Sequence, residues 1–253
     1  MTGDFGWTGE IPYDDGHFRI TASISMVPWL AAYPVRFPPV EQALHEPDGL
    51  LAAGGALTPD WLLAAYERGI FPWFGESDPI LWWSPDPRLV LFPDELRVRR
   101  SLAKRLRNGG FRVTFDGAFD SVIHQCGALR ESREGTWITH QVRAAYGRLH
   151  RLGYAHSIEV WQAGELVGGL YGLALGRVFF GESMFSLRPD ASKIALVELS
   201  RRLQAQGFTL IDCQVRTDHL LSMGAREIDR DEFIRYLEQH AWIERAPQPW
   251  AAD

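Results

Sequence analysis

The spacing of hydrophobic residues predicts helices in the middle of the chain and strands after about residue 155. The first clear element is a helix over 58–68, because Thr58 can cap its first turn and Gly69 can end it. No regular period is found before residue 36. The next predicted elements are a basic helix over 100–108, a strand over 111–115 and a helix over 139–152.

After residue 155 the pattern becomes that of a strand-rich domain. Gly164 and Gly176 separate three apolar runs, which predicts an antiparallel meander, and Asp190 can cap the long helix that follows. This order is an α+β (mixed α/β) arrangement, and it resembles the acyl-CoA N-acyltransferase fold, which passes an acyl group to an amine. The predicted elements are strands over 157–162, 165–175, 177–183 and 208–212, and helices over 191–206, 218–223 and 229–239.

Five large aromatic residues lie within thirteen positions, at a spacing that fits neither a helix face nor a strand face. Prolines among them fix φ and remove backbone donors, so we expect a stiff, irregular wall. A wall of flat rings suits a ligand such as a nucleobase, but the same residue types also suit a hydrophobic plug between two domains. The aromatic residues are Phe71, Trp73, Phe74, Trp82 and Trp83.

A change of composition after Pro87-Arg88 indicates a domain boundary. We expect an N-terminal extension of uncertain order over 1–36, a small N-terminal domain over 37–88 and an N-acyltransferase-like domain over 89–253. A chain of 253 residues has ample material for a buried core.

Charge argues against a protein that coats nucleic acid through its overall field, since 26 basic and 32 acidic residues give a net charge of −6. One stretch is nevertheless densely basic. Charge runs are usually solvated faces, but a basic patch beside an aromatic wall is typical of proteins that hold a single-stranded nucleic acid end. The basic residues are Arg97, Arg99, Arg100, Lys104, Arg105 and Arg107.

Other site classes find no support in the sequence. The two cysteines form no disulfide framework, and the eight histidines lack metal-ligand spacing, so we expect no metal. Nucleophile elbow, P-loop and dinucleotide fingerprints are absent, which argues against serine hydrolysis and nucleotide hydrolysis. No apolar run approaches a membrane span and no signal peptide is recognisable, so we expect a cytoplasmic protein without membrane contact.

Three polar residues at predicted strand ends are the candidates for chemistry. Asp212 and Gln214 are two apart on one strand and should project to the same side. Glu182 ends the third meander strand and would join them if the two strands are neighbours. A carboxylate among apolar neighbours is partly desolvated, as in general bases and cation sites. The alternative is that these acids cap the helices that follow.

Glycines at 168, 169 and 172 indicate either a bulge or close approach by a ligand.

Taken together, these motifs resemble the bacterial leucyl/phenylalanyl-tRNA–protein transferases, in order over about residues 37–240. The matching stretches are EPDGLLA at 46–52, YERGIFPWF at 66–74, PILWWSPDPR at 79–88, EGTWIT at 134–139, HSIEVW at 156–161, GESMFS at 181–186 and IDCQ at 211–214.

The resemblance implies an aminoacyltransferase that moves Leu, Phe or less often Met from aminoacyl-tRNA to proteins with N-terminal Arg or Lys. Such transfer marks the acceptors for degradation by the N-end rule pathway. No metal or coenzyme is expected, and we expect a monomer. Because the donor is an activated ester and the acceptor an amine with a pKa of about 8, the enzyme mainly has to position both and accept one proton.

The resemblance also implies roles for individual residues. Asp212 and Gln214 would orient and deprotonate the acceptor amine, and Glu182 would help to hold the acceptor or the aminoacyl group. The basic run from Arg97 to Arg107 would bind acceptor-stem phosphates. Trp73 and Trp137 would pack against the terminal adenosine, supported by Tyr66 and Tyr146. The side-chain pocket would consist of Leu170, Leu196, Leu199 and Leu203, and leucine at 199 and 203 leaves the choice between Leu and Phe open.

Two other functions would use some of the same features. A coenzyme A-dependent N-acyltransferase needs a pyrophosphate cradle at a helix start, but the turn from Leu187 to Ala191 has no glycine and contains Pro189 and Asp190. A non-catalytic RNA-binding module would use the aromatic and basic segments alone, and it leaves the polar residues at the strand ends unexplained.

Overall fold

Two β-sheets organise the chain, and the computed structural model describes residues 27–131, 136–241 and 247–250. The smaller sheet has the order β1-β2-β4-β3, and only its β1–β2 pair is parallel. Helix α1 (Pro59–Tyr66) packs against it, and Thr58 caps α1 as predicted, by accepting from the Trp61 N–H. The remaining elements of this part are β1 (Trp29–Leu30), β2 (Leu50–Gly54), β3 (Phe71–Pro72), β4 (Leu81–Trp83) and a 3-10 helix, η2 (Val40–Gln42).

The larger sheet has seven strands in the order β11-β5-β10-β9-β8-β7-β6. Strands β6 to β9 form an antiparallel series, β10 runs parallel to β9, and β5 and β11 complete the other edge in antiparallel register. The strands are β5 (Arg88–Leu91), β6 (Phe111–Phe115), β7 (Ala155–Gln162), β8 (Glu165–Leu175), β9 (Val178–Ser186), β10 (Leu210–Gln214) and β11 (Arg226–Ile228).

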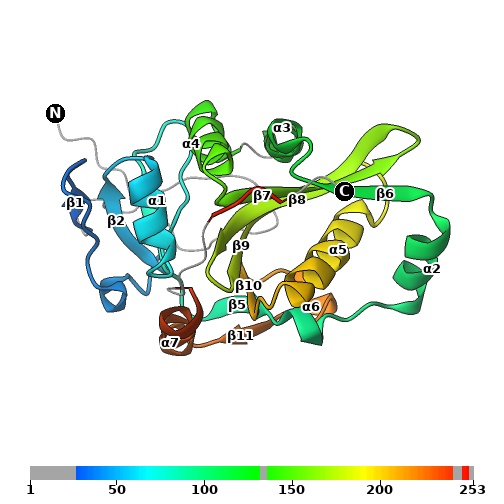
Figure 1. Cartoon of the computed structure of the whole chain (residues 1–253). Helices are drawn as coiled ribbons and strands as arrows, with labels where there is room; N and C mark the ends of the chain where they lie inside the picture. Colours follow the sequence, from blue (N-terminus) through cyan, green and yellow to red (C-terminus); the bar gives the residue numbers. More distant parts are fainter. Residues whose placement is uncertain (1–26, 132–135, 242–246, 251–253) are drawn as a thin grey trace.

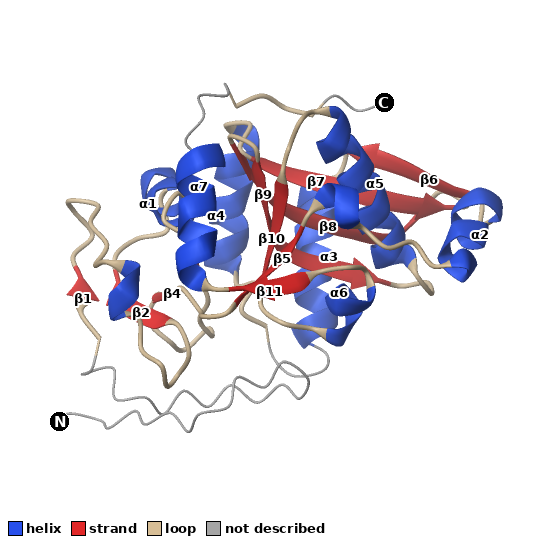
Figure 2. Ribbon diagram, turned by 90° about the horizontal axis from the view of Figure 1, so that it is seen from below, coloured by secondary structure: helices blue, strands red, loops and turns tan. Residues whose placement is uncertain are grey.

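Helices cover both faces of the larger sheet (Figure 1). α3 (Phe119–Glu131) and α4 (His140–Arg151) pack on one face, and α5 (Ala191–Ala205) packs on the other. α2 (Arg100–Asn108) lies at the end of the molecule far from the small sheet, as both ribbon views show (Figure 2). The other helices are η3 (Pro93–Glu95), α6 (Asp218–Ser222) and α7 (Arg230–His240). In the part of the chain that is described, no helix is both long and apolar enough to cross a membrane.

The predicted fold class is confirmed: a mixed α/β larger domain accompanies a separate N-terminal sheet. The meander, the long helix and β6 occur where the sequence predicts them. The prediction that Asp190 caps α5 with its side chain is wrong. Asp190 has φ +66° and makes no capping bond, because its carboxylate instead pairs with Arg105 and Lys193.

The aromatic segment is more regular than predicted. Two pieces of it form β3 and β4, paired with each other in the small sheet. Four of the five rings are buried, and only Trp73 is partly exposed. The expectation of an irregular wall is therefore corrected: these rings belong to a hydrophobic core that continues from the small sheet onto the α3–α4 face of the larger sheet. This arrangement agrees with the plug interpretation.

Residues 1–26 of the predicted extension lie outside the described residues. The rest of that extension contains β1, which the sequence did not predict. β1 adds to the edge of the small sheet in parallel with β2, so the part of the chain before residue 37 contributes a strand to the fold.

Candidate active site

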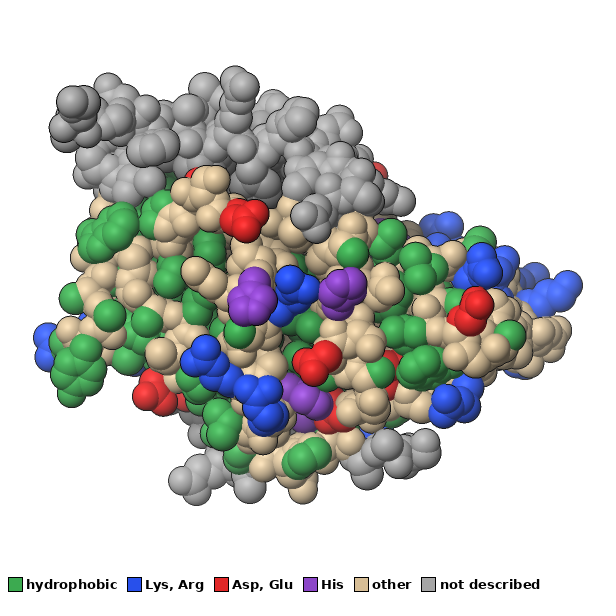
Figure 3. Space-filling view, turned by 90° about the horizontal axis from the view of Figure 1, so that it is seen from above, with side chains coloured by type: hydrophobic (Ala, Val, Ile, Leu, Met, Phe, Trp, Pro, Cys, Tyr) green, Lys and Arg blue, Asp and Glu red, His purple; other side chains and the backbone are tan. Residues whose placement is uncertain are grey.

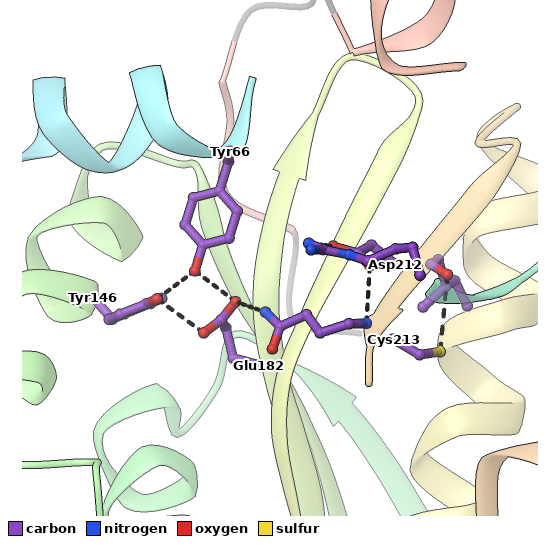
Figure 4. A network of polar contacts seen from close by, with 8 residues as sticks. Tyr66, Tyr146, Glu182, Asp212 and Cys213 are labelled. Atoms are coloured by element: carbon purple, nitrogen blue, oxygen red, sulfur yellow. Dashed lines mark hydrogen bonds and ion pairs between the residues drawn. The ribbon is translucent and has the colours of Figure 1, made fainter. Parts of the chain in front are cut away.

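The buried carboxylate of Glu182 is the centre of a polar network between the two sheets (Figure 4). The Tyr66 hydroxyl of α1 donates to its Oε1 at 2.6 Å, and the Tyr146 hydroxyl of α4 donates to its Oε2 at 2.9 Å. The amide Nε2 of Gln214 donates to Oε1 at 2.9 Å, and the two tyrosine hydroxyls also bond to each other. Glu182 thus receives donors from three separate elements, which offset the cost of burying its charge.

Two neighbouring β-bulges bring Glu182 and Gln214 together. In the β8–β9 ladder, Tyr171 pairs with Ser183 and Gly172 with Gly181, so Glu182 is the extra residue. In the β10–β5 ladder, Cys213 is skipped between Asp212 and Gln214, and Gln214 adopts φ +62°. The parallel β9–β10 register sets Asp212 beside Phe180, which puts both bulges at the same level of the sheet. Bulges re-aim side chains, and these two direct one carboxylate and one amide at each other.

The glycines of β8 serve the backbone rather than a ligand. A Cβ on Gly172 would lie 2.1 Å from the Phe180 carbonyl oxygen, at the bulge that exposes Glu182 to its donors. A Cβ on Gly168 would lie 2.4 Å from the Cβ of Ala191 in α5. The bulge and the close approach of a helix therefore account for two of the three strand glycines.

Arg88 is a site residue that the sequence reasoning missed. Its Nε and Nη2 donate to Oδ1 and Oδ2 of Asp212, each at 2.8 Å, and both side chains are buried. The guanidinium lies between the rings of Phe71 and Phe233, 4.8 and 4.7 Å from their centroids. The signal was present, since Arg88 ends the PILWWSPDPR stretch, but its partner lies 124 positions further along the chain.

Asp212 links this ion pair to the Glu182 network. Its Oδ1 also accepts from the backbone N–H of Gln214 at 2.9 Å, which stabilises the left-handed backbone at that residue. Neither acid caps a following helix, because Asp190 and Thr217 occupy the N-cap positions of α5 and α6. The predicted grouping of Asp212, Gln214 and Glu182 is therefore present in the structure, and the capping alternative does not apply.

The electrostatics of Glu182 suit proton transfer near neutral pH. The pKa of the Glu182 carboxyl is raised to about 7, mainly because burial disfavours its charge, and the charge of Asp212 raises the pKa further. Hydrogen bonds from Tyr66, Tyr146 and Gln214 act in the opposite direction and lower the pKa. Burial and the Glu182 charge raise the pKa of both tyrosine hydroxyls above their ordinary value, so they remain donors. The arrangement can accept a proton, or hold a cationic group, beside two neutral hydroxyls.

We expect the raised pKa of Glu182 to weaken the fold as pH rises. The pKa of Glu182 is 4.5 in the unfolded chain and about 7 in the folded protein. Between these two pH values the folded state holds a proton that the unfolded state has lost. The free energy of unfolding should therefore fall by about 3 kcal/mol more in the wild type than in Glu182→Gln. Urea denaturation of both proteins at pH 4.5, 6 and 8 measures this difference. Parallel curves for the two proteins would contradict the assignment.

The aromatic residues predicted for an adenosine differ in exposure. Trp73 is partly exposed, its ring 5.5 Å from that of Trp83, while Trp137 is 9% exposed. Tyr66 and Tyr146 are fully buried and bonded to Glu182, which agrees with a supporting role rather than a stacking surface. Packing of an adenosine on the tryptophans stays a prediction.

The four leucines of the predicted side-chain pocket lie together in one core cluster. Each is at most 3% exposed, and the cluster fills the space between α5 and the sheet. Glu182, Tyr66 and Tyr146 lie on the opposite, α3–α4 side, whose core cluster holds both tyrosines. The pocket therefore remains a prediction. Its members are Leu170, Leu196, Leu199 and Leu203.

The basic run is exposed, but it does not adjoin the aromatic segment. All six cations lie on α2 or just before it, at the opposite end of the molecule from β3 and β4 (Figure 1). Arg105 is engaged in the ion pair with Asp190 at 3.1 Å. The expectation of a basic patch beside an aromatic wall is thus corrected, because nearness in sequence across β5 does not persist in space. Among the described residues, no group of three or more His, Cys, Asp or Glu is arranged to hold a metal ion.

Solved structures similar to this chain include acetyltransferases of low sequence identity. One is an aminoglycoside acetyltransferase from an uncultured soil metagenomic sample, 12% identical with a TM-score of 0.36 over 57% of this chain and 97% of that one. Another is a GCN5-related N-acetyltransferase from Kribbella flavida, 13% identical with a TM-score of 0.35 over 66% and 60% of the two chains.

Sequence relatives are much closer. The leucyl/phenylalanyl-tRNA–protein transferase of Chromohalobacter salexigens is 65% identical over 90% of this chain and 89% of its own length. That of an Azoarcus species is 62% identical over 88% and 94% of the two chains. Residues 90–238 match the leucyl/phenylalanyl-tRNA protein transferase family, and residues 55–86 match its N-terminal domain. The chain is therefore a member of the leucyl/phenylalanyl-tRNA protein transferase family.

Proposed function

We propose that this protein transfers Leu or Phe, and less readily Met, from aminoacyl-tRNA to the α-amine of proteins with N-terminal Arg or Lys. Such transfer would mark the acceptor for N-end rule degradation, in the cytoplasm where charged tRNA is made. The observation that carries the proposal is the Glu182 network, a buried carboxylate with a pKa of about 7, in a chain of this family. The proposed enzyme acts as a monomer.

The reaction needs little beyond positioning and one proton acceptor. The neutral amine nitrogen attacks the ester carbonyl carbon, a C–N bond forms, and the C–O bond to the terminal ribose breaks. The amine gives up one proton, and the released ribose hydroxyl takes one, so the exchange balances without a cofactor. Holding the two reactants in attack geometry can lower the barrier by ~7–11 kcal/mol.

The geometry favours a division of roles among the three polar residues. The sequence-based assignment gave proton acceptance to Asp212 and Gln214. Both oxygens of Asp212 are occupied by Arg88, and the residue is fully buried, so we assign it the positioning of Gln214. Gln214 then orients the amine, and Glu182 accepts its proton, because a carboxylate with a pKa near 7 is matched to that step.

The binding assignments belong to the same proposal. Trp73 and Trp137 pack against the terminal adenosine, the leucine cluster under α5 receives the donor side chain, and α2 contacts phosphates. Partial exposure of Trp73 and exposure of the α2 cations support two of these assignments. We further propose a boundary between a small domain over 37–88 and a catalytic domain over 89–253, which the change of sheet at Arg88 supports.

The direct test is transfer of radiolabelled Leu or Phe from charged tRNA to an acceptor protein. We expect label on an acceptor with N-terminal Arg and none on the same acceptor with N-terminal Asp. Competing charged tRNAs then give the ranking of Leu, Phe and Met. Binding of charged and uncharged tRNA with equal affinity, without transfer to either acceptor, would contradict the enzyme and favour an RNA-binding module.

A further inference from the structure

A basic groove lies between α3 and α4, on the face of the larger sheet away from α5. Its cavity has a volume of about 430 Å³, and a single stripe of α4 forms one wall while the first turns of α3 form the other. Blue and purple side chains gather over these helices, apart from the blue group at the α2 end (Figure 3). The ionisable residues that line the groove are Asp120, His124, His140, Arg143, Arg148 and Arg151.

The groove has three guanidinium groups and one carboxylate, that of Asp120, so its charge is mainly positive. Within the described part of the chain, none of the three arginines forms an ion pair, and the buried Nε of Arg143 has no hydrogen-bond acceptor. Other exposed arginines do have carboxylate partners: Arg201 pairs with Glu198, and Arg216 with Glu227. On a chain of net charge −6, three guanidinium groups gather around one cavity with the single carboxylate of Asp120, so a bound anion would reduce their mutual repulsion.

The groove and the proposed reaction site share helix α4. The same helix, α4, sets Tyr146 against Glu182 with one side and lines the groove with another. His140 stands at the start of α4, where free N–H groups favour an anion, and Arg151 stands at its end. The helix rise gives about 16 Å between these positions, which is long enough for more than one phosphate of a nucleic acid strand.

We propose that this groove binds backbone phosphates of the aminoacyl-tRNA, and this inference rests on the transferase function proposed above. Guanidinium groups form forked bonds to phosphate oxygens, and such contacts position a nucleic acid without reading its bases. The groove belongs to the helix that contacts Glu182, whereas α2 lies at the far end of the molecule. A tRNA bound in the groove would contact the same helix that sets Tyr146 against Glu182.

The test compares tRNA binding across salt concentrations for matched charge variants of the full chain. The groove variant is Arg143→Gln/Arg148→Gln/Arg151→Gln. The control is Arg201→Gln/Arg216→Gln/Arg226→Gln, which removes the same charge from exposed positions elsewhere. Loss of three contacts should reduce the slope of log Kd against log salt by about 2. The ratio of the variant Kd to the wild-type Kd should therefore be roughly 100-fold larger at 0.1 M salt than at 1 M salt. The control should change the slope little.

A second variant separates binding from folding. A Cβ on Gly147 would lie 3.7 Å from Nη1 of Arg151 and 3.9 Å from Oδ1 of Asp120, which are ordinary contacts. Gly147→Ala should therefore keep or raise the melting temperature, because alanine favours a helix. It should also raise the Kd for tRNA several-fold, because the methyl group occupies the groove.

The outcomes distinguish this inference from the proposed function. Unchanged Kd and slope in the groove variant, with wild-type transfer intact, would overturn the groove and leave the transferase standing. Weaker binding of the acceptor protein with unchanged tRNA binding would likewise overturn it, in favour of an acidic peptide. Groove-dependent tRNA binding without any transfer by the wild type would support the groove and overturn the transferase.

Discussion

Replacing Glu182 with glutamine is expected to slow aminoacyl transfer by about 10²–10⁴-fold, the usual contribution of a general base. Glutamine keeps the size of the side chain and can still bond to Tyr66, Tyr146 and Gln214, but it cannot take a proton. The measurement is the single-turnover rate at saturating charged tRNA and acceptor. Under these conditions a change in affinity does not contribute, so the loss reports the chemical step.

The pH profile separates this role from a structural one. In the wild type, the rate should rise as Glu182 ionises near pH 7, and Glu182→Gln should retain only the inflection of the acceptor amine. Tyr66→Phe and Tyr146→Phe each remove a donor to the ionised carboxylate. Both should raise its pKa and move the first inflection to higher pH. A Glu182→Gln protein with the wild-type rate and profile would remove Glu182 from the chemistry.

Local signals explain why much of the fold could be predicted. Thr58 and Thr139 cap α1 and α4, and Gly164 and Gly176 with positive φ turn the meander. These features act within a few residues, so the sequence specifies them directly. β5 and β11 escaped prediction because they have four and three residues, too few for a period, and because they form by pairing with strands distant in sequence: β5 with β10, and β11 with β5.

The site was predictable in its members but not in its connections. Glu182, Asp212 and Gln214 were expected at the ends of neighbouring strands, and β9 and β10 are neighbours. The bulges at Glu182 and Cys213 could not be predicted, because a bulge is a property of the register between two strands. A pattern of residue types likewise indicates that a polar side chain is buried, but not which residue it bonds to.

The aromatic segment illustrates the limit of residue types most plainly. Density of rings predicted both a ligand wall and a plug, and only tertiary contacts decide between them. Trp82 stacks on Trp61 at 5.7 Å and meets Phe37 edge-on, which makes it part of the core. Trp73, unlike the other four rings, is partly exposed.

Replacing Arg88 with methionine is expected to lower the free energy of unfolding by about 3–5 kcal/mol, the cost of leaving a buried charge without its partner. The carboxylate of Asp212 would lose two bonds of 2.8 Å in a site that water does not reach. Phe71 and Phe233 would keep an apolar neighbour between them, so lost ring packing contributes little. Urea denaturation at neutral pH measures the change.

The double variant Arg88→Met/Asp212→Leu tests the reason for this loss. Removing both charges should restore most of the stability, because replacing a buried ion pair by apolar side chains is often neutral or stabilising. Transfer should not recover, since the Gln214 N–H loses its acceptor and the left-handed backbone that aims its amide at Glu182 is no longer held. If the double variant lost as much stability as Arg88→Met and Asp212→Leu do together, the two residues would not be coupled. Recovered transfer in the double variant would instead show that Gln214 keeps its orientation without Asp212.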